Sequence, residues 1–195
     1  MLSKQLQVFK KQLLAHDVVA VIDLEATCYD SFAEKQTYLS EVIEVGWVLY
    51  HIATGEITNK ESFYVKPTTS IVTPFCTELT GITAQQVADA PSFTDVMRQL
   101  KKHHEHHGVK LWLSQGNYDR RKLMSQCEAE GAVYPFDDHE WINIKTIARH
   151  RLDKKNRLGL KSLLEDLNLP LEGRQHSGAD DANNSARVLR ELLAL

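Results

Sequence analysis

The sequence has few cysteines and no long apolar stretch, so it lacks the features that mark disulfide-rich, zinc-binding or membrane proteins. Its three cysteines, Cys28, Cys76 and Cys127, are 48 and 51 positions apart, which excludes a CxxC zinc or redox motif and argues against a disulfide framework. No apolar stretch approaches a membrane span of about 18 residues. The amino terminus is interrupted by lysines and lacks the apolar stretch of a signal peptide. We therefore expect buried or idle thiols, no membrane contact and a cytoplasmic location.

The length and composition are those of a globular chain. It has 195 residues, 23 Lys and Arg against 26 Asp and Glu, and 43% apolar residues. This predicts a single domain over residues 1–195, with an amphipathic helix within residues 1–16 packed on it. A chain of this size buries a core that needs no disulfide or metal to hold it, so any metal would serve chemistry.

Hydrophobic periodicity predicts strands and helices that alternate after an initial hairpin. Strands are expected over 18–24, 41–51, 57–66 and 109–113, the second and third joined by a Gly-containing turn at 53–56. Helices are expected over 2–14, from the N-cap Ser92 to Gly108, and over 118–130, 142–150, 160–167 and 179–193. The stretch after Pro67 is expected to be irregular. The order of elements indicates an α/β three-layer domain with a mixed sheet.

Two carboxylates follow the most hydrophobic strand. Asp23 and Glu25 are two positions apart, so they lie on the same face at the downstream end of the strand. Ligands of open α/β sheets collect at such ends, and paired oxygen ligands suit Mg²⁺ or Mn²⁺. The competing interpretation is a solvated strand end that happens to carry two charges.

Two further elements place polar residues at comparable positions. Asp119 falls in the first turn of a helix after a second buried strand, where a carboxylate is ordinary because the helix dipole favours it. His176 is expected in a loop, with Asp181 in the first turn of the last helix. An imidazole beside acids is a candidate general base. Asp180 competes with Asp181, although the spacing from His176 favours Asp181.

In order and spacing, these five residues resemble the DEDDh group of 3′-to-5′ exonucleases, in the branch that contains histone-mRNA 3′ exonucleases and KapD. The motifs that carry the resemblance are DLEATC at 23–28, ELTGI at 78–82, SQGNYD at 114–119 and HSGADD at 176–181. The resemblance covers about residues 17–194 and implies a ribonuclease-H-like mixed sheet of about five strands flanked by helices. One position departs, since Tyr118 stands where many members have Trp.

The resemblance also implies a two-metal mechanism with Mg²⁺ or Mn²⁺. Asp23 would bridge two ions, and Glu25 and Asp181 would complete the site that activates water. Asp119 would support the second ion through water, and His176 would remove the proton from the attacking water.

A substrate site is implied by the same resemblance. The backbone of residues 24–27, including Ala26, would meet the terminal nucleotide, with Thr27 near its 3′ hydroxyl. Leu79 and Ile82 would pack on the end base. Ordinary core packing is an equal interpretation for these two apolar residues.

Charge gives a further indication of a nucleic-acid partner. Residues 145–157 hold six basic residues and one acid, which gives a local charge of +5. Because the net charge of the whole chain is −3, the remaining residues together carry −8. Such a segment could track phosphates or be a solvated loop.

Histidines and tryptophans have simpler interpretations. The run His103-His104-Glu105-His106-His107 is interpreted as a solvated helix end, because no third metal ligand with matching placement is visible. The tryptophans are expected in the core.

The leading hypothesis is a metal-dependent 3′-to-5′ exonuclease acting on single-stranded 3′ ends and releasing 5′-mononucleotides. RNA is favoured over DNA by the resemblance alone. The alternatives are a DNA-directed exonuclease of the same fold and a non-catalytic nucleic-acid-binding module, which would usually have lost one of the five residues. An aspartyl phosphatase would want Asp at Glu25 and a downstream Lys. The sequence does not specify a protein partner.

Overall fold

The computed structural model describes residues 4–37, 39–136 and 139–194. Its strands are β1 (Val18–Ala26), β2 (Val42–His51), β3 (Ile57–Tyr64), β4 (Leu111–Ser114) and β5 (Glu140–Asn143). Its helices are α1 (Lys4–Leu13), α2 (Phe32–Thr37), α3 (Pro74–Thr80), α4 (Ala84–Ala88), α5 (Phe93–His107), α6 (Tyr118–Glu130), α7 (Ile144–Arg151), α8 (Leu160–Asp166) and α9 (Gly178–Ala194).

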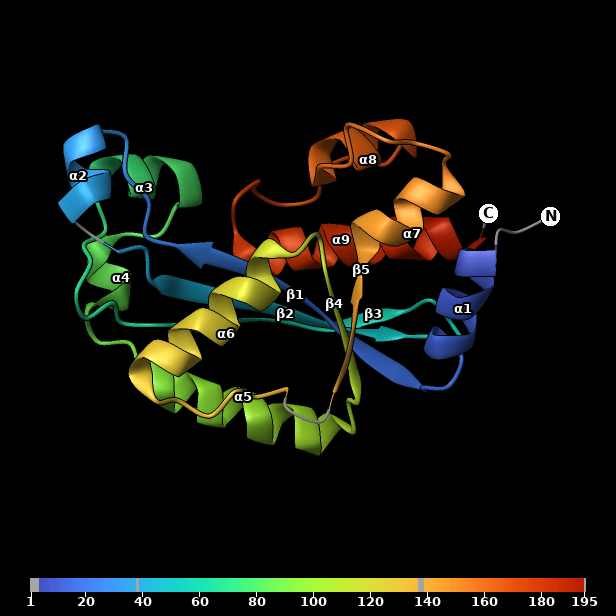
Figure 1. The fold of residues 1–195 in the computed structure, drawn as a ribbon, viewed down its shortest axis with the longest axis horizontal. Coiled ribbons are helices and arrows are strands. Elements are labelled where there is room, and N and C mark those ends of the chain that lie inside the picture. The colour runs from blue at the N-terminus through green and yellow to red at the C-terminus, as the bar shows by residue number, and fades with distance from the viewer. Residues whose placement is uncertain (1–3, 38, 137–138, 195) are drawn as a thin grey trace.

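The sheet has five strands in the order β3-β2-β1-β4-β5. β1 pairs antiparallel with β2, and β2 with β3, whereas β1–β4 and β4–β5 are parallel. Helices α5 and α6 lie on one side of the sheet, and α1, α7 and α9 lie on the other (Figure 1). The predicted α/β fold with a mixed five-stranded sheet flanked by helices is therefore confirmed.

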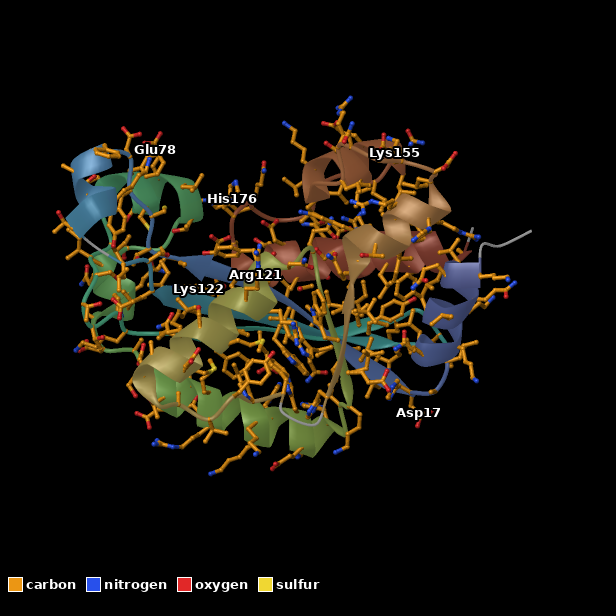
Figure 2. All side chains as sticks on the ribbon, viewed as in Figure 1. Asp17, Glu78, Arg121, Lys122, Lys155 and His176 are labelled. Atoms are coloured by element: carbon orange, nitrogen blue, oxygen red, sulfur yellow. The ribbon has the colours of Figure 1, made fainter. Side chains whose placement is uncertain are left out.

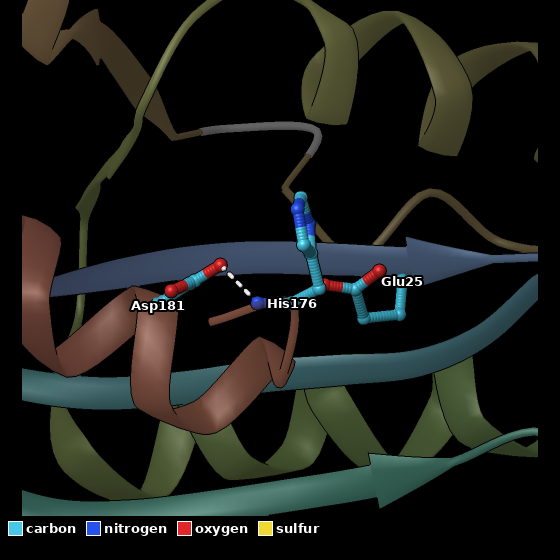
Figure 3. Close-up of side chains that lie close together, drawn as sticks. All are labelled: Glu25, His176 and Asp181. Atoms are coloured by element: carbon cyan, nitrogen blue, oxygen red, sulfur yellow. Dashed lines mark hydrogen bonds between the residues drawn. The ribbon is translucent and has the colours of Figure 1, made fainter. Parts of the chain in front are cut away.

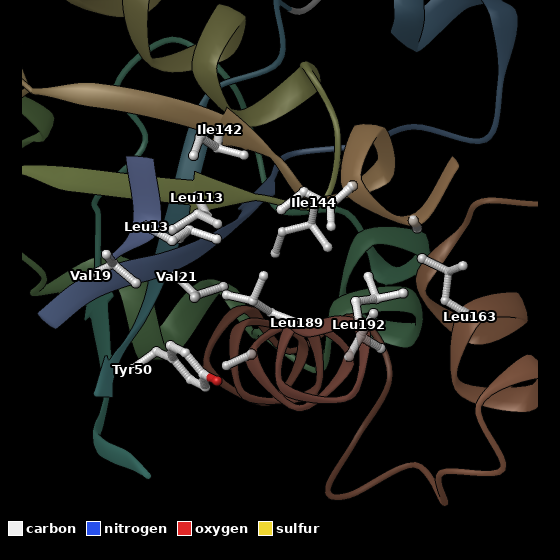
Figure 4. Packing of buried hydrophobic residues seen from close by; sticks show 14 of the residues in the cluster. Leu13, Val19, Val21, Tyr50, Leu113, Ile142, Ile144, Leu163, Leu189 and Leu192 are labelled. Carbon is white, nitrogen blue, oxygen red and sulfur yellow. The ribbon is translucent and has the colours of Figure 1, made fainter. Parts of the chain in front are cut away.

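Strand β1 is buried on both faces because each face meets a layer of helices. Val19 and Val21 belong to a core formed with α7, α8 and α9, part of which Figure 4 shows. Ala20 and Ile22 alternate with them and belong to the second core, against α5 and α6. The continuous apolar run that predicted a central strand thus reflects two separate cores.

Several predicted bounds hold closely. α5 begins after the N-cap Ser92, whose hydroxyl accepts from the Asp95 N–H, and ends at Gly108 in the left-handed conformation. α6 occupies the predicted residues. The predicted first helix appears as α1, and its predicted first residue, Leu2, lies outside the described residues.

Other expectations were wrong. The helix predicted over 142–150 begins only at Ile144, because Ile142 pairs with Leu113 as part of β5. The stretch after Pro67 is not wholly irregular, since it contains α3 and α4. Thr73 and Thr83 cap these short helices. Strand β1 extends two residues beyond the predicted end and so includes Glu25.

Candidate active site

The carboxylates of β1 and α6 meet at one edge of the sheet. Asp23 and Glu25 stand on the same face at the end of β1, separated by the buried Leu24. Asp119 enters from α6, which follows β4, the parallel neighbour of β1. Its Oδ1 accepts from the backbone N–H of Leu24 at 3.3 Å. Parallel pairing of β1 with β4 therefore brings the three acids together.

His176 and Asp181 complete the cluster. His176 lies in the loop before α9, and Asp181 lies in the first turn of α9. The His176 backbone N–H donates to Asp181 Oδ2 at 3.0 Å, and His176 has a left-handed φ of 61°. Potential ligand atoms of Glu25, His176 and Asp181 all lie within 4.8 Å of one another (Figure 3). The five residues predicted to form the site thus converge on one cleft.

The geometry separates Asp180 from Asp181. Asp180 points to the other side of the α9 amino end, where Oδ2 accepts from the Arg174 backbone N–H at 2.8 Å and Oδ1 pairs with Lys60 of β3. The two acids therefore have different tasks, since Asp180 holds the loop that carries His176 while Asp181 faces Glu25.

Glu44 is a buried carboxylate that the sequence interpretation missed. It is 1% exposed on β2, opposite Glu25, and accepts from the N–H groups of Gly178 at 2.9 Å and Ala179 at 3.4 Å. A carboxylate at a helix amino end satisfies free N–H groups and is favoured by the dipole. The available signal was a single charge inside an otherwise apolar run at 42–49.

Close contact between α9 and β2 requires glycine at position 46. A Cβ atom at Gly46 would lie 1.8 Å from the carbonyl carbon of Gly178. The amino end of α9 therefore rests directly on the backbone of β2, which fixes Asp181 relative to β1.

Burial and mutual repulsion raise the pKa values of the clustered acids. Burial, and then the charges of Glu44 and Asp181, raise the pKa of Glu25 to about 8. Burial also raises the pKa of Asp119 to about 6, although hydrogen bonds from backbone groups partly oppose the shift. The pKa of Asp23 is raised well above its ordinary range by burial and by the neighbouring acids. Ionising this cluster is unfavourable without a compensating positive charge.

The donor set fits divalent cations. Asp181 Oδ1 is buried and makes no hydrogen bond within the part of the chain that the structure describes. An unpartnered carboxylate oxygen beside Glu25 and Asp23 is a ligand for a hard cation, and a cation would offset the repulsion among the acids.

The cleft has a volume of about 350 Å³. Its walls include Leu24 and Ala26 of β1, Cys28 just after this strand, the 37% exposed Leu79 of α3, and Tyr118. Of the predicted substrate contacts, Ala26 and Leu79 are thus in the cleft. The side chains of Thr27 and Ile82 are buried instead: Thr27 Oγ1 bonds to Ser70 and to the Glu41 N–H, and Ile82 packs with Ile43 and Val87.

Arg174 connects the His176 loop to the far side of the cleft. Its Nη2 donates to the carbonyl oxygen of Glu78, in α3, at 2.7 Å. The guanidinium lies against Gly81, where a Cβ atom would come within 1.8 Å of Nη1. Its charge opposes the rise in the pKa of Glu25 that burial causes. Figure 2 shows Glu78 and His176 on neighbouring segments.

The histidine run is not wholly solvated, which corrects the sequence interpretation. His104 is fully buried, and its Nε2 accepts from Trp47 Nε1 at 2.9 Å. Burial, followed by the nearby His139, lowers the pKa of His104 to about 3. His104 is thus a neutral core residue. Trp47 and Trp112 are buried as predicted, whereas Trp141 is only partly buried and packs against the same core.

The basic segment at 145–157 is a mixture of paired and unpaired charges. Lys154 pairs with Asp166, and Arg157 lies 3.6 Å from Glu165. Lys155 lies beside α8 (Figure 2), whereas Lys145 lines the cleft. Lys145, the first residue of this segment, therefore reaches the cleft.

Comparison with known proteins identifies relatives over most of the chain. The exonuclease family model RNase_T matches residues 20–189. The 3′-5′ exoribonuclease 1 of Rattus norvegicus is 33% identical over 186 residues, which cover 91% of this chain and 53% of that protein. The chain spans about half the length of the curated relatives it matches.

Solved structures agree with this result. The nuclease domain of 3′hExo, a DEDDh family member bound to rAMP, matches with a TM-score of 0.84 and 31% identity over 92% of each chain. A 3′-exonuclease, solved for its 3′-end specific recognition of the histone mRNA stem-loop, matches with a TM-score of 0.84 and 29% identity. That match covers 96% of this chain and 70% of the other. Among the described residues, no helix is long and apolar enough to cross a membrane.

Proposed function

Because this chain belongs to the DEDDh, RNase T-like family of exonucleases, we propose that it hydrolyses single-stranded RNA from the 3′ end and releases 5′-mononucleotides. The observation that carries this proposal is the convergence of Asp23, Glu25, Asp119, His176 and Asp181 on one cleft. A non-catalytic binding module would not need a general base beside four clustered acids, three of which are buried.

Exonucleases of the DEDDh family use divalent metals, and we propose Mg²⁺ or Mn²⁺, two per site, for this chain. Asp23, Glu25, Asp119 and Asp181 would hold them. When bound, two such ions lower the pKa of a water molecule and offset the charge that develops on the phosphate.

The other steps belong to the side chains. His176, held by Asp181 through its backbone, accepts the proton of the attacking water. Leu79 packs against the terminal base, and the backbone near Ala26 meets the terminal sugar. Contacts of this kind are tolerant of sequence, which suits successive removal of nucleotides.

RNA is favoured as substrate because the relatives named above are exoribonucleases and a 3′-exonuclease that recognises an mRNA stem-loop. No residue of the cleft is assigned to the 2′ hydroxyl. The preference for RNA therefore needs a direct comparison with DNA of the same sequence.

The test is a time course on 5′-labelled single-stranded RNA and DNA, with Mg²⁺, Mn²⁺ or chelator, resolved on a gel. We expect a ladder that shortens from the 3′ end, faster on RNA and absent with chelator. The Asp23→Asn variant serves as the inactive control. Faster shortening of DNA would favour the DNA-directed alternative, and no shortening of either polymer would favour the binding module.

A further inference from the structure

The strand order divides the catalytic cleft into two walls on either side of β1. On the β2 side lies the amino end of α9, which rests on Gly46 and brings His176 and Asp181. On the other side lie β4 and β5, and the helices that follow them bring Asp119 and Lys145. Asp23 stands between the walls at the end of β1.

Lys145 is held at the cleft by local structure. It lies in the first turn of α7, where its backbone N–H donates to the N-cap Asn143 at 2.9 Å. Asn143 Nδ2 donates in turn to Asn117 Oδ1 at 2.8 Å, two positions before Asp119. The Lys145 ammonium passes over Gly116, where a Cβ atom would lie 3.2 Å from Nζ. Gly116 has a φ of 127°, which disfavours a side chain there in any case.

The ammonium of Lys145 is not held by a direct polar contact with any of the described residues. Within the described ranges it makes no hydrogen bond or ion pair, in contrast to Lys154 and Lys60. It lines the cleft beside Asp119 and opposes the rise in the pKa of that acid. An unpaired cation on the wall of an acidic cleft is suited to bind a phosphate as a point charge.

The direction of the reaction decides which phosphate this is. Displacement at phosphorus places the attacking and leaving oxygens roughly in line on opposite sides. If His176 deprotonates the attacking water, the attack comes from the α9 wall. The leaving 3′ oxygen, and the rest of the strand, then face the wall formed by β4 and β5.

We propose that Lys145 binds the first phosphate upstream of the scissile bond and so holds the strand that leaves. This inference rests on the proposed exonuclease function. It adds a residue that binds a polynucleotide substrate upstream of the terminal nucleotide. Lys145, the first residue of the basic segment at 145–157, would thus bind substrate.

The test compares three substrates that differ only on the leaving side. Uridine 5′-(p-nitrophenyl phosphate) has no upstream nucleotide, UpU has only the scissile phosphate, and UpUpU adds the phosphate that Lys145 would bind. The variants are Lys145→Met, which removes the charge, and Lys145→Arg, which keeps it. Lys101→Met, on the exposed surface of α5, removes one charge far from the cleft and is the matched control.

We expect Lys145→Met to raise KM for UpUpU about 10-fold more than for UpU. The salt dependence of log KM for UpUpU should also become shallower by about 0.7, the value for one lost phosphate contact on a single strand. Lys145→Arg should retain most of the wild-type values, and Lys101→Met should match wild type. Equal losses on all three substrates would overturn the proposal, because they would indicate a structural role.

Two other outcomes also decide the matter. A fall in kcat for UpU, with the nitrophenyl ester spared, would place Lys145 at the leaving oxygen and overturn the upstream assignment. If Lys145→Met does not fold, Lys145→Gln takes its place in the same comparison, and a wild-type KM that is equal and equally salt-sensitive for UpUpU and UpU would still overturn the proposal. Failure of the wild type to hydrolyse any substrate would instead contradict the proposed function.

Discussion

The backbone N–H of Gly178 donates to the carboxylate of Glu44 at 2.9 Å, so a buried acid of β2 caps the helix that carries Asp181. The Ser62 hydroxyl donates to the other carboxylate oxygen. Both carboxylate oxygens of Glu44 therefore accept hydrogen bonds, and Glu44 positions Asp181, the candidate site residue of α9, without lining the cleft.

Removing this cap should loosen the site. Glu44→Ala leaves two buried N–H groups unsatisfied, and we expect a loss of about 1–3 kcal/mol in the free energy of unfolding. Glu44→Gln should lose less, because the amide oxygen can still accept. Gly46→Ala should impair metal binding more than stability alone explains, because α9 must shift. Denaturant titration and metal titration measure the two effects, and a wild-type metal affinity in Gly46→Ala would contradict the positioning role.

Replacing a central acid should separate catalysis from folding. We expect Asp23→Asn or Asp119→Asn to reduce turnover by several orders of magnitude while the far-ultraviolet circular dichroism spectrum stays unchanged. Without metal, either variant should be at least as stable as wild type, because a repelling charge has been removed. Glu128→Gln, on the exposed part of α6, is the matched control. Full turnover in either variant would rule out these residues as essential ligands.

His176→Ala tests the general base. We expect a loss of about 10²–10⁴-fold in kcat, with metal affinity retained, because only the proton transfer is removed. Metal affinity is the informative measurement, since the imidazole lies within 4.8 Å of potential ligand atoms of Glu25 and Asp181. A large loss of metal affinity would indicate that His176 is a ligand.

Metal should stabilise the protein more at alkaline pH. The pKa of Glu25 is raised from 4.5 to about 8 in the folded protein. Its contribution to metal-free stability is therefore present below about pH 4.5 and is lost as the pH rises through about 8. A cation binds the ionised form, so protons compete with it at lower pH. Calorimetry should show a larger Tm increase on adding Mn²⁺ at about pH 8.5 than at about pH 6. Equal increases would contradict the raised pKa.

The His104–Trp47 contact predicts acid sensitivity at a place remote from the cleft. The pKa of His104 is lowered from 6.5 to about 3, in an environment that also includes His103, His107 and His139. Its contribution to stability is present above about pH 6.5 and is lost as the pH falls toward 3. His104→Gln keeps an acceptor for Trp47, so we expect a flatter dependence of unfolding free energy on pH in this range. The exposed His106→Gln should retain the wild-type dependence.

Helices and strands could be predicted where neighbouring residues in the sequence mark their ends. They could not be predicted where they depend on contacts with distant segments. α5 and α6 each end at a glycine, Gly108 and Gly131, and this fixed their carboxyl ends. β5 has only four residues and exists because Ile142 pairs beside β4, which no local pattern records. The cap of α4, with Thr83 and Gln86, was a local signal that we did not use.

The candidate site divides in the same way. Asp23, Glu25 and Asp119 could be located because strand ends and first helical turns are visible in a sequence. The tasks of Glu44, Arg174 and Lys145 depend on strand order and on contacts between distant segments, so they required the structure. The histidine run misled because spacing alone does not show that His104 points toward Trp47.

The bond from Arg174 to the Glu78 carbonyl has a consequence for selectivity. It ties α3, which carries Leu79, to the loop that carries His176, so one hydrogen bond joins the two flanks of the proposed terminal-nucleotide site. An RNA 3′ end with an added bulky group could enter only if the two flanks moved apart, and this movement would break the hydrogen bond. The width of the entrance would then select among 3′ termini, and it would be set by an arginine that is neither a proposed metal ligand nor the proposed general base.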